Sequence, residues 1–370
     1  MSFAALLWAG CAACSRASSS GGATREPATG GTATTTTTTS KAVATTTEKA
    51  EVSKPADEPV VVVFTGMCDA SGAVALSDRK FVVADDEDNV LRVYDVEQGG
   101  APLAGADVSA DLKLPLKKKK KPGSVPVAPE ADIEAATRIG DRAYFMTSHG
   151  RNSSGKAKPE RLRFFATTTP ESGEIEVIGE PYDGLLADLL ADSRFAGFEL
   201  AKAAELAPKA PGGLNLEGMT ARKEGGVWLG FRNPIPEGRA LLVPLLNPEE
   251  LVAGKKARFG DPLKLDLGGL GVRSLSSYRD RYLIVAGPFD QGEASRLFVW
   301  DGGNQAQALD QIALQGFNPE GFFTPEGRDR VMLLSDDGSV SIDGTDCKRL
   351  RDPGQKRFRG LWVSLPLSKG

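Results

Sequence analysis

Short apolar runs with β-type alternation fill residues 60–367 and are separated by a polar five-residue pattern that recurs five times. The copies occupy residues 69–73, 132–136, 215–219, 271–275 and 318–322. Each is followed, eleven or twelve residues after its third position, by an apolar run centred on Val82, Phe145, Trp228, Ile284 or Met332. Repeated units of short strands are typical of a β-propeller. The pattern therefore predicts an all-β propeller of five four-stranded blades.

The apolar alternation also predicts where the strands lie. The predicted ranges are 73–76, 80–84 and 90–96 in blade one, whose fourth strand is unclear; 135–139, 142–147, 161–166 and 174–178 in blade two; 219–222, 226–231, 239–245 and 259–267 in blade three; 274–278, 282–286, 296–300 and 308–314 in blade four; and 321–324, 330–334, 339–342 and 358–365 in blade five. Leucines at i, i+4 spacing predict a short helical insertion near residues 183–207. The run 60–63 is predicted to pair with the last blade, which would latch the ring and cover a sheet edge.

The amino-acid composition excludes some classes of function. Hydrophobic residues make up 41% and charged residues 25% of 370 residues, as in ordinary soluble proteins. The net charge of −4 gives no attraction to nucleic acid, so no nucleic-acid partner is expected. His149 is the only histidine, which excludes sites built from several histidines.

The N-terminal residues predict export. Residues 1–14 are small and apolar, as in a secretory leader, and 7–11 resemble a lipobox in which Cys11 would carry the lipid. Trp8 is bulky for that motif, and no basic residue precedes the apolar run. Residues 15–59 are rich in Thr, Ser and Ala and predict a disordered tether before a propeller domain at 60–367. We expect a periplasmic or cell-surface location, with membrane contact only through a lipid anchor.

Two cysteines lie in the predicted ring. Cys68 opens the first repeat and Cys347 lies in the last. Because a ring brings its first and last blades together, these cysteines are candidates for a disulfide. Two buried free thiols are the alternative.

Propeller geometry predicts one site. The start of each innermost strand lies on the same face as the loop between the second and third strands, so these segments meet at one mouth of the channel. The third position of the repeats is Ser71, Glu134, Glu217, Arg273 and Glu320, and the hairpin tips carry Asp85, Asp86, His149, Arg151, Arg232, Asn233, Asp290 and Asp336.

Each group of these residues has two interpretations. Glu134, Glu217 and Glu320 could hold a hard cation such as Ca²⁺, or accept backbone hydrogen bonds and pair with Arg273. Arg232 and Arg273 could bind an anionic ligand, or they could form ion pairs with the glutamates. His149 could act as a general base or be a turn residue beside Gly150.

Known catalytic motifs do not decide the function. The sequence contains no G-x-S-x-G elbow, phosphate-binding loop or H-E-x-x-H motif. Asn215-Leu216-Glu217-Gly218-Met219, followed by Gly230-Phe231-Arg232-Asn233-Pro234 and by residues 239–245, resembles the bacterial DUF3616 family of unknown function. The resemblance extends over roughly residues 60–367. The Asn-x-Glu-Gly element is also similar, more distantly, to esterase-like phytase propellers, which implies ester or phosphoester hydrolysis.

Three hypotheses follow. The first is an exported, monomeric propeller that binds a small anionic ligand or a protein partner at the channel mouth. The second is a Ca²⁺-type metal-dependent esterase or phosphoesterase, with Ca²⁺ as the one candidate cofactor. The third is a structural propeller that contacts proteins through its outer strands.

Overall fold

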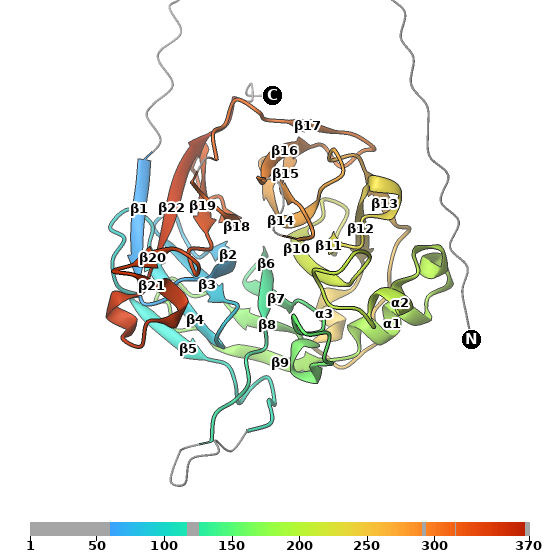
Figure 1. The fold of residues 1–370 in the computed structure, drawn as a ribbon, viewed down its shortest axis with the longest axis horizontal. Helices are drawn as coiled ribbons and strands as arrows, with labels where there is room; N and C mark the ends of the chain where they lie inside the picture. Colours follow the sequence, from blue (N-terminus) through green and yellow to red (C-terminus); the bar gives the residue numbers. More distant parts are fainter. Residues whose placement is uncertain (1–59, 117–125, 291–293, 315, 367–370) are drawn as a thin grey trace, which may run out of the picture. The chain divides into compact units, whose positions relative to one another are not determined.

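Five antiparallel four-stranded sheets form a ring in the computed structural model, which describes residues 60–116, 126–290, 294–314 and 316–366. Figure 1 shows the innermost strand of each sheet near the centre of the ring. The predicted five-bladed propeller is therefore confirmed. The predicted leader, the tether and Cys11 lie outside the described residues.

Each of the first four blades consists of four strands that are consecutive in the sequence. Blade one contains β2 (Ala70–Ala75), β3 (Lys80–Asp85), β4 (Val90–Asp95) and β5 (Ala104–Asp107). Blade two contains β6 (Ile133–Ile139), β7 (Arg142–Thr147), β8 (Phe164–Thr168) and β9 (Val177–Tyr182). Blade three contains β10 (Asn215–Ala221), β11 (Val227–Asn233), β12 (Ala240–Leu245) and β13 (Leu263–Leu265). Blade four contains β14 (Gly271–Tyr278), β15 (Arg281–Gly287), β16 (Arg296–Trp300) and β17 (Ala306–Ala308).

The last blade joins both ends of the propeller. Its order is β18 (Pro319–Phe323), β19 (Arg330–Ser335), β22 (Arg357–Ser364) and β1 (Val60–Thr65). β1 pairs with β22 in antiparallel register from Val60 opposite Trp362 to Thr65 opposite Arg357. The predicted latch is thus confirmed, and it ties the start of the ring to its end.

The prediction of a third blade-five strand at 339–342 is wrong. β20 (Ser341–Ile342) pairs only with β21 (Thr345–Asp346), in a small separate hairpin. The turn at Asp343, where φ is +49°, and Gly344 reverses the chain after two paired residues. β22 has eight residues and pairs with β19 from Arg330 to Leu334, so it takes the third place.

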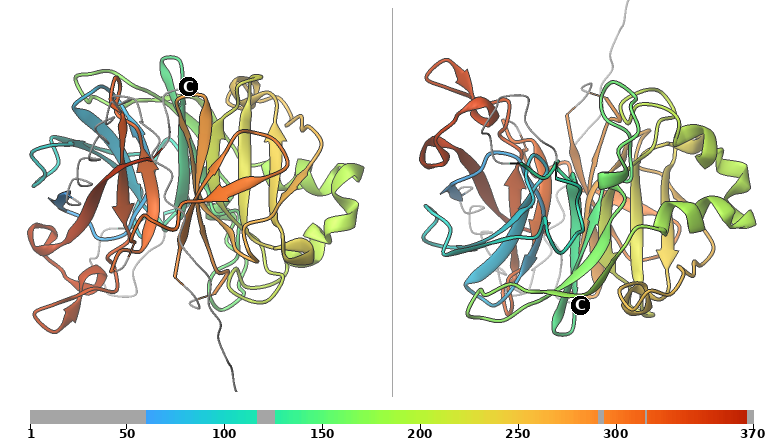
Figure 2. Two further views of the ribbon diagram at one scale, coloured as in Figure 1. Left: turned by 90° about the horizontal axis from the view of Figure 1, so that it is seen from above. Right: turned by 90° about the horizontal axis from the view of Figure 1, so that it is seen from below.

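Helical segments lie outside the ring of blades (Figure 2). The predicted insertion is α1 (Leu185–Ala191), the 3₁₀ helix η2 (Ser193–Phe198) and α2 (Leu200–Ala203). The other helical turns are η1 (Pro159–Arg161), η3 (Pro236–Gly238), α3 (Pro248–Leu251), η4 (Cys347–Arg349) and η5 (Pro353–Gln355). Among the described residues, none of these helices has the length and apolar character to cross a membrane.

The core consists of layers between neighbouring blades. One layer, for example, packs Phe64 and Phe358 of the last blade against Phe81 and Tyr94 of blade one. The insertion contributes Leu185 and other side chains to the layer between blades two and three. Burial of both faces of each sheet explains why the strands read as apolar runs.

Close contact between inner strands explains the fourth position of the repeat, which is Gly72, Ala135, Gly218, Ser274 or Gly321. A Cβ added to Gly72 would lie 2.6 Å from the carbonyl carbon of Ala135 in the next blade. The added Cβ at Gly321 would overlap the carbonyl oxygen of Ser71. Only small residues allow the inner strands to approach this closely round the axis.

We predict that Gly72→Ala lowers the free energy of unfolding by about 1–3 kcal/mol, because the new methyl group meets backbone that cannot yield locally. Urea denaturation measures the change. Gly197→Ala is the control, since its added Cβ meets no atom within 4 Å. Equal stability of the two variants would contradict the packing explanation.

Candidate functional site

A β-bulge lies at the third position of the repeat in every blade. The pairing of each inner strand with its neighbour skips this position, at Ser71–Gly72, Glu134, Glu217, Arg273 and Glu320. A bulge leaves a residue unpaired and turns its side chain away from the regular alternation. The four charged third-position side chains thereby line one channel mouth.

Two adjoining cavities form this mouth. The acidic half has a volume of about 410 Å³ and the arginine half about 430 Å³. They share Asp69, Lys209, Arg232, Glu320, Asp336 and Lys348. The structure therefore brings the predicted Glu134, Glu217, Glu320, Arg232, Arg273 and Asp336 to one opening.

The arginine half is an ion-pair network from blades three to five. Arg232 donates to Glu217 at 2.7 Å, and Arg273 Nε lies 3.9 Å from the second carboxylate oxygen of Glu217. Arg273 also pairs with Glu320 and donates to Asn318 at 2.7 Å. Two of the three glutamates predicted as cation ligands thus have arginine partners, which is the alternative interpretation given above.

Backbone carbonyls hold Arg232 in place. Its Nε donates to the Pro288 carbonyl at 2.9 Å and its Nη2 to the Asp290 carbonyl at 3.1 Å. Because three of its donors are engaged within the chain, Arg232 is held in one place, where it lines both halves of the mouth.

The acidic half crowds carboxylates from blades one and two. Carboxylate oxygens of Asp69, Asp85 and Asp86 lie within 4.8 Å of one another, and so do those of Asp86, Asp132 and Glu134. Glu134 is in this cluster, whereas neither described set includes Glu217 or Glu320. Asp86 belongs to both sets and so joins them.

Several of these carboxylates lack a partner. Asp69 is 4% exposed and Glu134 is 9% exposed, and within the described ranges neither carboxylate has a hydrogen bond or an ion pair. Asp86 Oδ1 is also buried without a hydrogen-bond partner. Asp132 differs, because Arg161 binds it at 2.7 Å and also binds Glu130 at 2.7 Å.

Burial is the main cause of the raised pKa values in the acidic cluster. Burial, reinforced by Asp336 and Asp85, raises the pKa of Asp69 to about 8. Burial and Asp88 raise the pKa of Asp85 to about 7. Burial also raises the pKa of Asp132 to about 6, against the opposing charge of Arg161. The pKa values of Asp86 and Glu134 lie well above the usual range for the same reason, and each group repels the charge of other carboxylates.

Lys348 carries the positive charge beside this cluster. It binds Glu87 at 2.8 Å and lines both halves of the mouth. Its neighbour Cys347 forms a disulfide with Cys68, which precedes Asp69, and the two Cα atoms are 5.9 Å apart. The disulfide therefore holds Lys348 and Asp69 near each other.

His149 and Arg151 do not line the mouth cavities. His149 is 2% exposed, has φ +55°, and its Nδ1 lies 2.7 Å from the Thr147 carbonyl. Burial lowers the pKa of His149 to about 4, so the ring is neutral. Arg151 donates to the carbonyls of Ala204 and Gly155, at the edge of the insertion.

Sequence reasoning missed part of the site. Asp69 and Asp132 occupy the first position of the repeat, and Arg161 and Lys348 come from segments outside it. The first positions Asn215 and Asn318 bind Glu217 and Arg273. The polar residues at the first position of four repeats could have indicated that this position also contributes to the site.

We predict that the unfolding free energy in EDTA falls as pH rises from 5 to 8. The raised pKa values of Asp69, Asp85 and Asp132 mean that the folded protein holds protons which the unfolded chain, with Asp pKa values near 3.9, has released. This stabilisation is complete below about pH 4 and is lost as pH passes through the folded pKa values. Chemical denaturation at several pH values measures the slope.

Asp69→Asn should make that slope shallower, because it removes one titrating group. Asp141→Asn, in the exposed turn between β6 and β7, is the matched control. A stability that is flat or rises over this pH range would show that the cluster is ionised and compensated in the folded state.

Comparison with solved structures finds distant likeness. A glutaminyl cyclase from Myxococcus xanthus is 10% identical with a TM-score of 0.42, over 83% of this chain and 95% of that one. A GH43 β-1,3-galactosidase is 9% identical with a TM-score of 0.43, over 80% of this chain and 90% of that one. A PQQ-bound aldose sugar dehydrogenase from Streptomyces coelicolor is 13% identical with a TM-score of 0.37, over 82% of this chain and 98% of that one. Such values transfer no activity to this chain.

Sequence comparison is more specific. No curated protein matches the chain. Residues 171–320, from the end of blade two to the start of the last blade, match the profile of the family described as "Protein of unknown function (DUF3616)". The predicted resemblance to this family is therefore confirmed over residues 171–320, which are part of the range 60–367 predicted from the sequence.

Proposed function

We propose that this propeller binds a divalent cation of the Ca²⁺ type in the acidic half of its channel mouth and, beside it, an anionic ligand. One observation carries the proposal: Asp69 and Glu134 are buried carboxylates without a partner among the described residues, and they line a cavity that other carboxylates share. Buried charges normally pair with one another or coordinate a metal.

The donor set fits a hard cation. Two carboxylate sets meet at Asp86, and every donor is an oxygen, as Ca²⁺ prefers. The acidic half has nine carboxylate residues against five basic ones, counting all residues that line it. Lys348 is already paired with Glu87, so it compensates only part of this excess.

The opposite wall suits an anion. Arg232, Arg273 and Lys209 line the arginine half together with Ser295 and Ser339. Four basic and four carboxylate residues line it in all, so it lacks the acidic excess of the other half. A bound cation next to these side chains would attract a carboxylate or phosphate group from one side while the arginines orient it from the other. A small anionic ligand is therefore favoured over a protein partner.

Export is a further part of the proposal. Disulfides persist in oxidising compartments, and the Cys68–Cys347 bridge suits a protein outside the cytoplasm. A periplasmic or cell-surface location, with a lipid on Cys11, agrees with the apolar leader in the sequence. Pairing of β1 with β22 closes the ring within one chain, which suits a monomer.

Ca²⁺ should raise the melting temperature of EDTA-treated protein at pH 8 by several degrees, because it compensates the carboxylates and binds only the folded state. Asp86→Asn should abolish most of this shift, since Asp86 belongs to both carboxylate sets. Differential scanning fluorimetry with titrated Ca²⁺, and calorimetry for the affinity, measure both effects.

Asp141→Asn is the control with the same chemical change on an exposed turn. It should keep the full Ca²⁺ shift. The proposal fails when the wild-type protein shows neither a shift nor a heat of binding, or when Asp86→Asn and Asp141→Asn respond alike.

A metal-dependent phosphoesterase is the second candidate. The observation that favours it is that arginines and carboxylates line one mouth. In the part of the chain that the structure describes, the buried Arg273 Nε has no hydrogen-bond partner. A bound divalent cation supplies Lewis-acid polarisation and a more acidic water. Arg232 and Arg273 would orient the phosphoryl group, and Glu134, whose pKa is raised, would exchange a proton with water.

The hydrolase candidate predicts turnover of p-nitrophenyl phosphate in Ca²⁺ and its loss in EDTA. Glu134→Gln should lower kcat by at least about 100-fold, the usual effect of losing a general base. Circular dichroism checks that the variant is folded. Absence of turnover by the wild-type protein, together with a retained Ca²⁺ shift, would favour the binding protein over the enzyme.

A further inference from the structure

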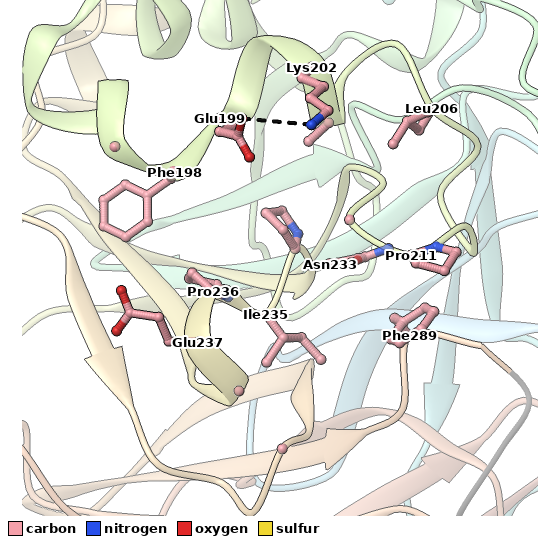
Figure 3. Close-up of a pocket in the computed structure, with 16 residues that line it drawn as sticks. Phe198, Glu199, Lys202, Leu206, Pro211, Asn233, Ile235, Pro236, Glu237 and Phe289 are labelled. Atoms are coloured by element: carbon pink, nitrogen blue, oxygen red, sulfur yellow. Dashed lines mark ion pairs between the residues drawn. The ribbon is translucent and has the colours of Figure 1, made fainter.

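A second pocket lies beside the channel mouth, between the insertion and the loop after β11 (Figure 3). Its volume is about 570 Å³, within the range of small-molecule sites. Phe198, Ile235 and Phe289 are half-buried and contribute to its lining, together with Leu206 and Pro236. These side chains present apolar surface to whatever occupies the pocket.

The charged and amide groups round this pocket already have partners. Lys202 lies 3.7 Å from Glu199, and Lys264 binds Glu237 at 2.7 Å. The side-chain amide nitrogen of Asn233 donates to the backbone carbonyls of Pro208 and Ala210. The charged groups lie at the exposed rim, whereas the aromatic and aliphatic side chains give the pocket surface that suits the apolar part of a ligand.

The wall between the pocket and the mouth is one residue thick. Arg232 lines the mouth and the next residue, Asn233, lines the pocket. Likewise, Pro288 and Asp290 line the mouth while Phe289 between them lines the pocket. The two cavities therefore lie on either side of the same backbone segments, and a ligand that occupied both would pass over these segments.

The loop that separates the cavities is common to both. Pro208 and Lys209 line the mouth, whereas Pro211 and Gly212 line the pocket. Asn233 holds this loop through two hydrogen bonds. The rim residues Glu199 and Glu237 have φ values of +51° and +54°, a backbone conformation that costs energy in residues other than glycine.

We infer that the pocket is the apolar subsite of the channel-mouth site, and that the ligand is a small amphipathic anion. Its anionic head group would lie in the arginine half, and its aliphatic or aromatic part would cross the Asn233–Phe289 wall into the pocket. This inference rests on the proposed function, because it extends the anion site of the mouth.

Alkyl phosphates of increasing chain length are the probes, used with the full chain in Ca²⁺ below their micelle concentrations. Each methylene that enters the pocket should strengthen binding by roughly threefold to fourfold. We therefore expect decyl phosphate to bind at least about 10-fold more tightly than ethyl phosphate, measured by isothermal titration calorimetry.

Phe289→Ser and Phe198→Ser should remove most of the gain from the decyl chain and leave ethyl phosphate binding unchanged. Leu246→Ser is the control, since Leu246 is an exposed leucine that does not line the pocket. It should bind both phosphates as the wild-type protein does.

The outcomes separate the two proposals. Equal binding of ethyl and decyl phosphate would overturn the apolar subsite and leave the anion site of the mouth intact. A gain for decyl phosphate that Leu246→Ser removes as much as Phe289→Ser would mean surface adsorption, and would also overturn the subsite. Failure of both phosphates to bind would overturn the mouth site and the subsite together.

Discussion

Contact between the inner strands of neighbouring blades is the constraint on which the site depends. Backbone of one strand lies against backbone of the next, so the fourth position of the repeat must be small, as at Gly72 and Gly321. The position just before it lies in a bulge, which places a charged side chain at the channel mouth in four of the five blades. A single local device, repeated five times, therefore produces both the tight axis of the fold and the convergence of charged residues from distant parts of the sequence.

Charge is not mixed evenly round this mouth. Arg232 and Arg273 come from blades three and four, and each is bound within its own half by glutamate, by asparagine or by backbone carbonyls. These contacts fix both arginines, and among the described residues neither forms an ion pair with a carboxylate of blades one and two. The result is an opening with an excess of carboxylates on one side, which protons or the cation proposed above would compensate. An extended anion that also contacts a metal would match such an arrangement on both sides.

The repeat allowed the number of blades and the convergence of third-position residues to be predicted, because both follow from its register. The latch was predicted from the separate apolar run 60–63. The catalytic interpretation of His149 depended on side-chain direction, and its left-handed φ turns it into the protein. The acidic cluster was harder to predict, since it combines Asp69 and Asp132 from first positions with Asp86 from a hairpin tip. Lys348 lies outside every repeat, and only the folded hairpin places it at the mouth. The repeat thus predicts where the site lies, whereas the chemistry of the site also depends on residues outside the repeat, such as Asp86 and Lys348.

Ring closure and site chemistry are linked through the same few contacts. β1 completes the last blade, and the disulfide joins Cys68, three residues after β1, to Cys347. Asp69 and Lys348 are the direct neighbours of these cysteines in sequence, and both line the mouth. The link also runs through backbone, since Asp69 forms an isolated bridge with Asp336. A propeller whose ends separated would therefore lose the position of the lysine that partly compensates its acidic cluster. Closure consequently sets not only the stability of the ring but also the electrostatic potential at its opening.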